Sequence, residues 1–285
     1  MLEIKLLPDS EVEIIGEISA EIFMSSRNQA VAEFSKRAEM DGFRKGRIPE
    51  NILVKKIGTG AVLEKMAVIA LEKEYPKIIK EYKIKAIGRP EIIITKLAEN
   101  NPLGFKIKTS VLPGITLPDY KSIAKKITAK KEEVSADNKD AGNKLKEKEK
   151  KRMEILENIA ASVKQKMPKC LIDLEKNKMA EEMKRNIVQT GLKWDDYLKH
   201  IKKTEEELKN GWESDAAKRV KYGLIIEEMA EQEKIEVPAE ELGKETAAMV
   251  EHHKKLGQNL DKERVKHYLT GIMRNEKLFQ MLEKE

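Results

Sequence analysis

Cysteine, aromatic residues and long apolar runs are all scarce in this chain of 285 residues. Its single cysteine, Cys170, cannot form an internal disulfide bond. Its longest apolar runs, such as Ala67 to Leu71, fall far short of the ~18 to 20 residues that cross a bilayer. The first residues also lack the basic and apolar segments of a signal peptide. These absences favour a protein of the reducing cytoplasm, with no membrane segment.

Signatures of catalysis and of metal binding are missing as well. Gly58-Thr59-Gly60 is too short to form a phosphate-binding loop of the Walker type. The four histidines, His200, His252, His253 and His267, have no cysteines at zinc spacing. We therefore expect no catalytic residue, no metal and no cofactor.

Charge, by contrast, is abundant. The chain has 56 Lys and Arg against 50 Asp and Glu, a net charge of +6, and 37% of its residues are charged against a typical ~25%. Most of the surplus lies in residues 121–151, which hold 11 basic and 6 acidic side chains. A nucleic-acid partner is therefore one interpretation of the charge.

The first 112 residues alternate between strand and helix patterns. Apolar residues recur with a period of two before and after the Pro8-Asp9-Ser10 turn, and again over Glu91 to Leu97 and Leu103 to Leu112. Helical spacing runs from Glu21 to the Asp41-Gly42 stop and from Ile52 to Tyr82, where Pro76 predicts a kink or a restart. In the second helix the expected inner stripe is Val68, Leu71, Tyr75, Ile78 and Tyr82. These patterns predict an α+β amino-terminal domain over residues 1–115.

The remainder divides into a charged segment and a helical domain. Residues 116–150 are poor in large apolar side chains, so they form either a linker or the exposed beginning of a long helix. From Arg152 onward nearly all patterns are helical, with a capping box at Thr204 and Glu207 opening a helix that runs to Met229, and a cap at Asp261. Five or six helices are expected over residues 151–285.

One loop carries the most specific signal. It reads Gly42-Phe43-Arg44-Lys45-Gly46-Arg47-Ile48-Pro49 and lies between the two helices of the first domain. Its glycines and proline favour a tight, protruding turn. Phe43 either anchors the loop to its own core or waits for a partner, while the cations favour phosphates or carboxylates in that partner.

This loop resembles the ribosome-binding signature of the trigger factor family of bacterial chaperones. Strand and helix order before and after the loop is similar to the amino-terminal domain of that family, and Ser110 to Leu117 resembles the end of that domain. In the later part, Met167 to Glu175 and Ala217 to Leu224 resemble the helical chaperone domain. The resemblance implies an α+β ribosome-binding domain followed by an all-α, elongated multi-helix chaperone domain.

The resemblance also implies partners. The ribosome, through a tunnel-exit protein and ribosomal RNA, would be contacted by the loop, at Gly42, Phe43, Arg44, Lys45, Gly46, Arg47 and Pro49. Nascent and unfolded chains would be the clients, and a homodimer of the free protein is a further expectation. Members of the family commonly carry an inserted prolyl isomerase domain of about 100 residues. Only the charged segment occupies that place here, so we expect no isomerase activity.

Several large, flexible side chains on helix faces are candidates for holding apolar client segments. Thioethers repack readily against varied apolar partners. The candidates are Met179, Met183, Ile187, Met229, Met249 and Met273. The expected function is thus an ATP-independent chaperone at the ribosome. The alternative is a basic RNA-binding or ribosome-associated factor that holds no clients.

Overall fold

The computed structural model describes residues 2–39, 43–44, 46–129 and 141–284. The chain divides into two units with separate cores. Unit 1 comprises residues 1–113 and 166–171, and unit 2 comprises residues 114–165 and 172–285.

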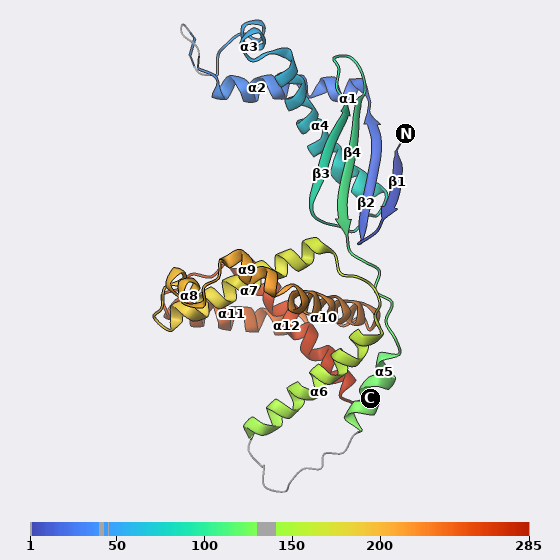
Figure 1. The fold of residues 1–285 in the computed structure, drawn as a ribbon, viewed down its shortest axis with the longest axis vertical. Coiled ribbons are helices and arrows are strands. Elements are labelled where there is room, and N and C mark those ends of the chain that lie inside the picture. The colour runs from blue at the N-terminus through green and yellow to red at the C-terminus, as the bar shows by residue number, and fades with distance from the viewer. Residues whose placement is uncertain (1, 40–42, 45, 130–140, 285) are drawn as a thin grey trace. The chain divides into compact units, whose positions relative to one another are not determined.

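A four-stranded antiparallel sheet forms one layer of unit 1 (Figure 1). The strands lie in the order β1-β2-β4-β3, with bounds β1 Glu3–Leu7, β2 Glu11–Ile18, β3 Ala86–Lys96 and β4 Leu103–Val111. The period of two is confirmed in β2, where Val12 and Ile14 are buried and Glu17 is exposed. Leu6, which continues that period, is 83% exposed, since β1 is an edge strand with a neighbour on one side only.

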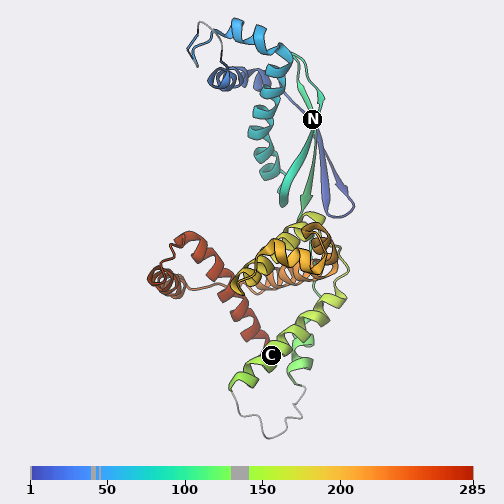
Figure 2. The same cartoon turned by 60° about the vertical axis from the view of Figure 1, so that its left-hand side comes forward.

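Four helices form the rest of unit 1, and Figure 2 shows the longest of them lying along one face of the sheet. Their bounds are α1 Ala20–Ser25, α2 Arg27–Arg37, α3 Glu50–Ile57 and α4 Thr59–Glu81. The core between sheet and helices contains fully buried Phe23, Met66 and Phe105. Each helical region that the sequence predicts as continuous is split in two. The first breaks at Ser26 and the second at Gly58, whose φ of +93° suits glycine.

Helix α4 also corrects two expectations. Of the kink and the restart that the sequence left open at Pro76, the restart is wrong, because Pro76 lies inside a helix that continues through it to Glu81. The predicted inner stripe is only partly right, because Leu71 and Ile78 are buried whereas Val68 and Tyr82 are each 44% exposed. The buried side of α4 is instead centred on Met66 and its neighbours, because α1 and α2 also pack against the first half of the helix.

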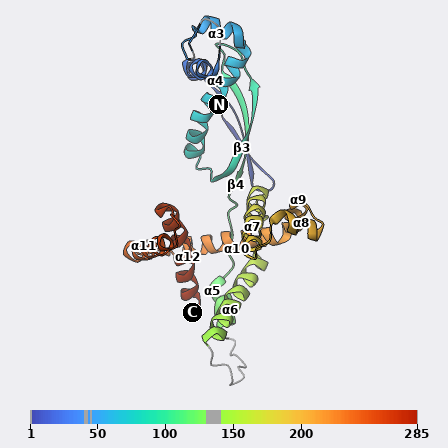
Figure 3. The ribbon, with the colours of Figure 1, turned by 90° about the vertical axis from the view of Figure 1, so that its left-hand side faces the viewer.

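Unit 2 is helical throughout its described part (Figures 1 and 3). The helices, of which α7 begins in the short segment assigned to unit 1, are α5 Tyr120–Thr128, α6 Ala141–Ser162, α7 Lys169–Gln189, α8 Trp194–Ile201, α9 Glu205–Gly211, α10 Glu213–Gln232, α11 Ala239–Lys255 and α12 Lys262–Leu282. The capping box at Thr204 and Glu207 and the cap at Asp261 are confirmed. The helix predicted from Thr204 to Met229 is broken at Trp212, so residues 141–284 hold seven helices.

Two apolar clusters hold unit 2 together. Helix α10 contacts both α6 and α12, and fully buried Ile155, Ile225 and Leu278 lie on these three helices. A second cluster of Leu242, Val265 and Leu269 joins α11 to α12 as a helical hairpin. None of the helices in the described ranges combines the length and apolar character needed to cross a membrane.

The charged segment before residue 151 contributes to unit 2. Helix α5 packs against α6 through buried Ala124 and Ile127. Helix α6 begins at Ala141, in agreement with the interpretation of this segment as the beginning of a long helix. Residues 130–140, which belong to the same predicted segment, lie outside the described residues.

Candidate functional site

Two hydrogen bonds to main-chain carbonyls hold the loop between α2 and α3 in place. The amide of Gly46 donates a hydrogen bond to the carbonyl of Ser35 at 3.1 Å, and Lys56 Nζ donates one to the carbonyl of Glu39 at 2.7 Å. Gly46 has a φ of +81°, a conformation that disfavours other residues. Gly42 and Lys45, two of the predicted site residues, lie outside the described residues.

Among the loop residues that the structure describes, 43–44 and 46–49, Ile48 is the buried one, and we take it as the anchor of the loop. Ile48 is only 7% exposed, whereas Phe43 is 38% exposed. Pro49 then occupies the N-cap of α3, where its restricted backbone suits the start of a helix. Of the two roles that the sequence left open for Phe43, the anchoring role therefore falls to Ile48, which the sequence analysis did not single out.

An ion-pair cluster fixes the helix that follows the loop. Arg27 in α2 donates to Glu50 in the first turn of α3 (Nε to Oε1, 2.9 Å) and to Glu99 between β3 and β4 (Nη1 to Oε1, 2.7 Å). The hydrogen bond that Arg27 donates to the Glu50 carboxylate raises the pKa of Arg27 above its usual value. Since the cluster ties α2, α3 and the sheet together, it limits movement of the loop's C-terminal end.

The exposed side of the loop presents an aromatic ring and cations. Phe43, Arg44 and Arg47 are all exposed, and neither arginine forms an ion pair within the part of the chain that the structure describes. A guanidinium is a planar donor that can bind phosphate or carboxylate with two parallel hydrogen bonds. The exposed side of the loop is therefore suited to binding an anionic or apolar partner.

The six client-binding candidates differ in accessibility. Met229 is fully buried in the core of unit 2, so it has no surface to offer a client and we remove it from the set. The other five are half-buried: Met179, Met183, Ile187, Met249 and Met273. Sequence periodicity alone could not separate Met229 from the others, because a core face and a binding face have the same spacing.

An apolar groove lies between α6 and α12 in unit 2. Its walls include Met153 and Ile272, each 45% exposed, together with Leu156 and Phe279, and its volume is about 510 Å³. The sequence analysis missed this groove, because its two walls lie more than a hundred residues apart in the chain. Met273, one of the predicted residues, is adjacent to Ile272 on α12.

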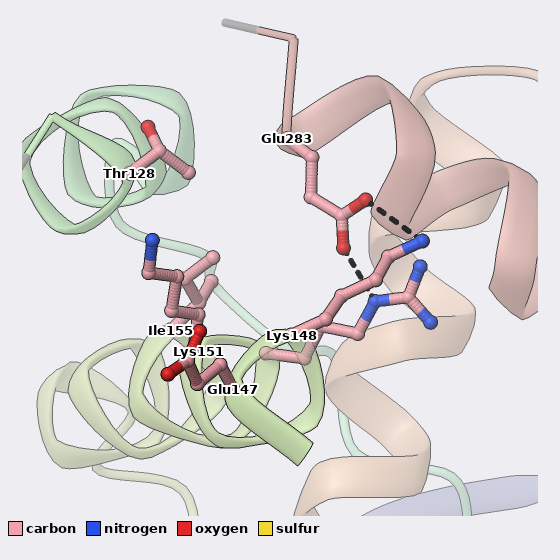
Figure 4. Close-up of a pocket in the computed structure, with 7 residues that line it drawn as sticks. Thr128, Glu147, Lys148, Lys151, Ile155 and Glu283 are labelled. Carbon is pink, nitrogen blue, oxygen red and sulfur yellow. Dashed lines mark hydrogen bonds and ion pairs between the residues drawn. The ribbon is translucent and has the colours of Figure 1, made fainter. Parts of the chain in front are cut away.

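Charged residues close one side of the groove. Arg152 in α6 binds Glu276 with two hydrogen bonds (2.6 and 2.9 Å) and Glu283 with one (2.6 Å), and its guanidinium lies 5.1 Å from the centre of the Phe279 ring. These contacts lower the pKa of Glu276 to about 2, chiefly through the bond with Arg152. Lys148 also reaches Glu283 in the neighbouring pocket, as Figure 4 shows.

Two family models together match residues 1–284. "Bacterial trigger factor protein (TF)" matches residues 1–148, and "Bacterial trigger factor protein (TF) C-terminus" matches residues 120–284. Because the two matches overlap, no isomerase domain lies between them.

Curated relatives are similar over part of the chain. Trigger factor from Mycolicibacterium smegmatis is 39% identical over 114 residues, which are 40% of this chain and 24% of the relative. Trigger factor from Bacillus subtilis is 30% identical over 140 residues, which are 49% of this chain and 32% of the relative. The matched segments thus span about a quarter to a third of these relatives.

A solved structure shares the fold of the whole chain. It is described as "Promiscuous Substrate Recognition in Folding and Assembly Activities of the Trigger Factor Chaperone", and it covers 99% of both chains with a TM-score of 0.61 and 15% identity. The α+β region with its four-stranded sheet and the helical region that follows agree with the predicted fold class. On the strength of both family models, the chain belongs to the bacterial trigger factor family.

Proposed function

We propose that the protein is an ATP-independent chaperone of the cytoplasm that docks near the ribosomal tunnel exit and holds nascent or unfolded chains. Family membership supports the general role. One observation carries the docking function. Ile48 is the buried residue that anchors the loop, so Phe43 and its neighbouring arginines are left exposed to a partner.

Docking and holding act together through local concentration. A chaperone held at the exit meets each emerging segment as though in an intramolecular reaction, so weak apolar contacts suffice. The loop would supply the ribosomal contact, with Phe43 entering an apolar pocket and the arginines binding phosphate or carboxylate groups. No bond is made or broken in this mechanism.

Co-sedimentation with ribosomes tests the docking role. We expect the triple change Phe43→Ala, Arg44→Ala and Lys45→Ala to reduce ribosome-bound protein at least tenfold, since it removes both the apolar and the charged contacts. The measurement is the bound fraction after pelleting ribosomes at fixed salt.

A matched variant controls for the loss of one ring and two charges. Tyr82→Ala, Lys73→Ala and Lys80→Ala removes the same groups from exposed positions in α4 and at its C-cap. If the loop variant co-sediments with ribosomes as completely as the wild type, the docking proposal is wrong. If Phe43→Ala alone has no effect while binding weakens steeply with salt, the alternative of an RNA-binding factor gains support.

Client holding is assigned to the groove between α6 and α12. Met153 and Ile272 expose flexible or branched apolar side chains on its two walls, whereas Met273 packs against the Leu242, Val265 and Leu269 cluster of the α11–α12 hairpin. A thioether adapts to apolar groups of different shape, which suits a surface that accepts many sequences. The half-buried Met179, Met183, Ile187 and Met249 remain candidates for further client contacts.

Suppression of aggregation tests this assignment. We expect Met153→Ser with Ile272→Ser to reduce protection of a model unfolded client at least twofold, because about 1 to 2 kcal/mol of apolar contact is lost per side chain. Light scattering during client dilution from denaturant gives the readout. Val68→Ser with Ile93→Ser, which alters exposed apolar residues of unit 1, is the control. Equal protection by wild type and groove variant would contradict the proposal.

A further inference from the structure

Cations gather at the end of the α11–α12 hairpin that is formed by residues 252–268, which we call the hairpin tip. The last turn of α11 and the first turns of α12 meet there because a short connection joins two antiparallel helices. The tip holds five cations against two carboxylates, Asp261 and Glu263: Lys254, Lys255, Lys262, Arg264 and Lys266. Three of the four histidines of the chain also lie in it: His252, His253 and His267.

Most of these cations have no partner. Lys255 pairs with Glu251 at 3.0 Å, and Asp261 is occupied in capping α12 through the amide of Arg264 at 2.8 Å. Lys254, Lys262, Arg264 and Lys266 are exposed and form no ion pair within the described residues. The tip is therefore a positively charged surface available to an external anion.

Helix stability explains only part of this charge. Cations in the last turn of α11 are favourable, since they face the negative end of the helix dipole. Lys262 and Arg264 lie instead in the first turn of α12, at the positive end of the helix dipole, where a cation is unfavourable. Because these cations reduce the stability of α12, we infer that they serve to bind an anionic partner outside the chain.

The tip also offers an exposed ring on an ordered support. Tyr268 in the second turn of α12 is 60% exposed. The connection is fixed by amides of Leu256 and Gln258 that bind the carbonyl of His253, and by a His253 Nδ1 contact of 2.7 Å with Gln258. An exposed ring next to cations suits single-stranded RNA, whose bases stack on aromatic side chains while cations bind its phosphates.

We propose that the hairpin tip binds single-stranded RNA, with Lys254, Lys262, Arg264 and Lys266 at phosphates and Tyr268 against a base. An acidic peptide would satisfy the cations but would leave the ring of Tyr268 without a stacking partner. This inference goes beyond the proposed chaperone function and does not depend on it, because the tip and the α2–α3 loop lie in different units.

Binding of the full chain to a labelled uridine oligonucleotide, followed by fluorescence anisotropy across a salt series, tests the proposal. Lys254→Gln, Lys262→Gln and Arg264→Gln should weaken binding at least tenfold at low salt. The slope of log affinity against log salt should fall by about 2, at ~0.7 per phosphate contact. Tyr268→Leu should cost about fivefold or more with little change in slope.

Three controls make the outcome decisive. Lys184→Gln, Arg185→Gln and Lys202→Gln removes the same charge from exposed positions outside the tip, and it should leave binding within twofold. Equal losses from the tip and control variants would overturn the proposal, because binding would then follow overall charge. If RNA binding is lost when Phe43, Arg44 and Lys45 are changed but not when the tip is changed, the α2–α3 loop is the RNA-binding site and the proposal is wrong. Equal competition by polyglutamate would overturn the assignment to RNA.

Discussion

Arg152 shows how one side chain can join two distant parts of the sequence. Its side chain is 17% exposed, and its guanidinium binds Glu276 in α12 and Glu283 at the C-cap of α12 and lies over the Phe279 ring, so it joins α6 to α12. Exposed ion pairs contribute little to stability. This ion pair contributes more, because Arg152 forms several hydrogen bonds with the two carboxylates and its side chain is largely shielded from solvent.

The pH dependence of that contact has a definite sign. Arg152 holds the pKa of Glu276 at about 2, below its ordinary value of 4.5, so the contribution is complete above pH ~4.5 and is lost as pH falls through about 2. Glu276 is 40% exposed, so solvent screening reduces the effect. We expect Arg152→Met to lower the free energy of unfolding by about 1 to 2 kcal/mol at pH 7.

Urea unfolding at pH 7 and at pH 3 checks this prediction, with the difference between the variants smaller at the lower pH. Arg185→Met is the matched control, because Arg185 is exposed in α7 and forms no ion pair within the described ranges. An Arg152→Met protein as stable as wild type at both pH values would show that the contact contributes nothing.

At the scale of the element, α4 contains a proline in its interior, although proline destabilises a helix there. Pro76 is exposed in the interior of the helix, where it removes one main-chain hydrogen bond and crowds the preceding turn. The helix persists because tertiary packing of its buried face outweighs the local cost, with Met66 and Ile69 among the residues buried against the sheet and its neighbours.

Pro76→Ala is therefore expected to stabilise unit 1 by about 2 kcal/mol. The gain is the ~3 kcal/mol cost of an interior proline less the ~0.4 to 1 kcal/mol by which proline restricts the unfolded chain. Urea unfolding followed by circular dichroism measures it. Lys73→Ala, at an exposed position one turn earlier, should change stability by less than about 0.5 kcal/mol. A destabilised Pro76→Ala protein would contradict this account.

At the scale of the whole molecule, the absence of an internal isomerase domain defines the activity to expect. The two family matches adjoin and overlap, and the charged segment 116–150 supplies α5 and the beginning of α6 instead of a further domain in its described part. Few large apolar residues are available there to line a proline-binding pocket.

We accordingly expect no prolyl isomerase activity above background. A protease-coupled assay with a proline-containing peptide measures the rate of cis-to-trans conversion, which is slow enough to follow without a catalyst. A known prolyl isomerase serves as the positive control under the same conditions. A rate that rises in proportion to the concentration of this protein would contradict the prediction.

Local patterns predicted much of the fold. The strand pairs, the capping box at Thr204 and the cap at Asp261 depend on neighbours within a few residues, which the sequence contains. Breaks at Ser26, Gly58 and Trp212 were missed because each interrupts apolar spacing that continues on the other side. Boundaries of this kind are decided by packing and not by periodicity.

The sequence by itself determined the family, the order of strands and helices, and the loop whose chemistry suits docking. Only the tertiary structure decided that Ile48 is the anchor and Phe43 is exposed, that Met229 belongs to the core, and that α6 and α12 form a groove. The physical reason is the same in each case. Burial and the meeting of distant side chains depend on contacts across the fold, whereas secondary structure, capping and turns depend on contacts along the chain.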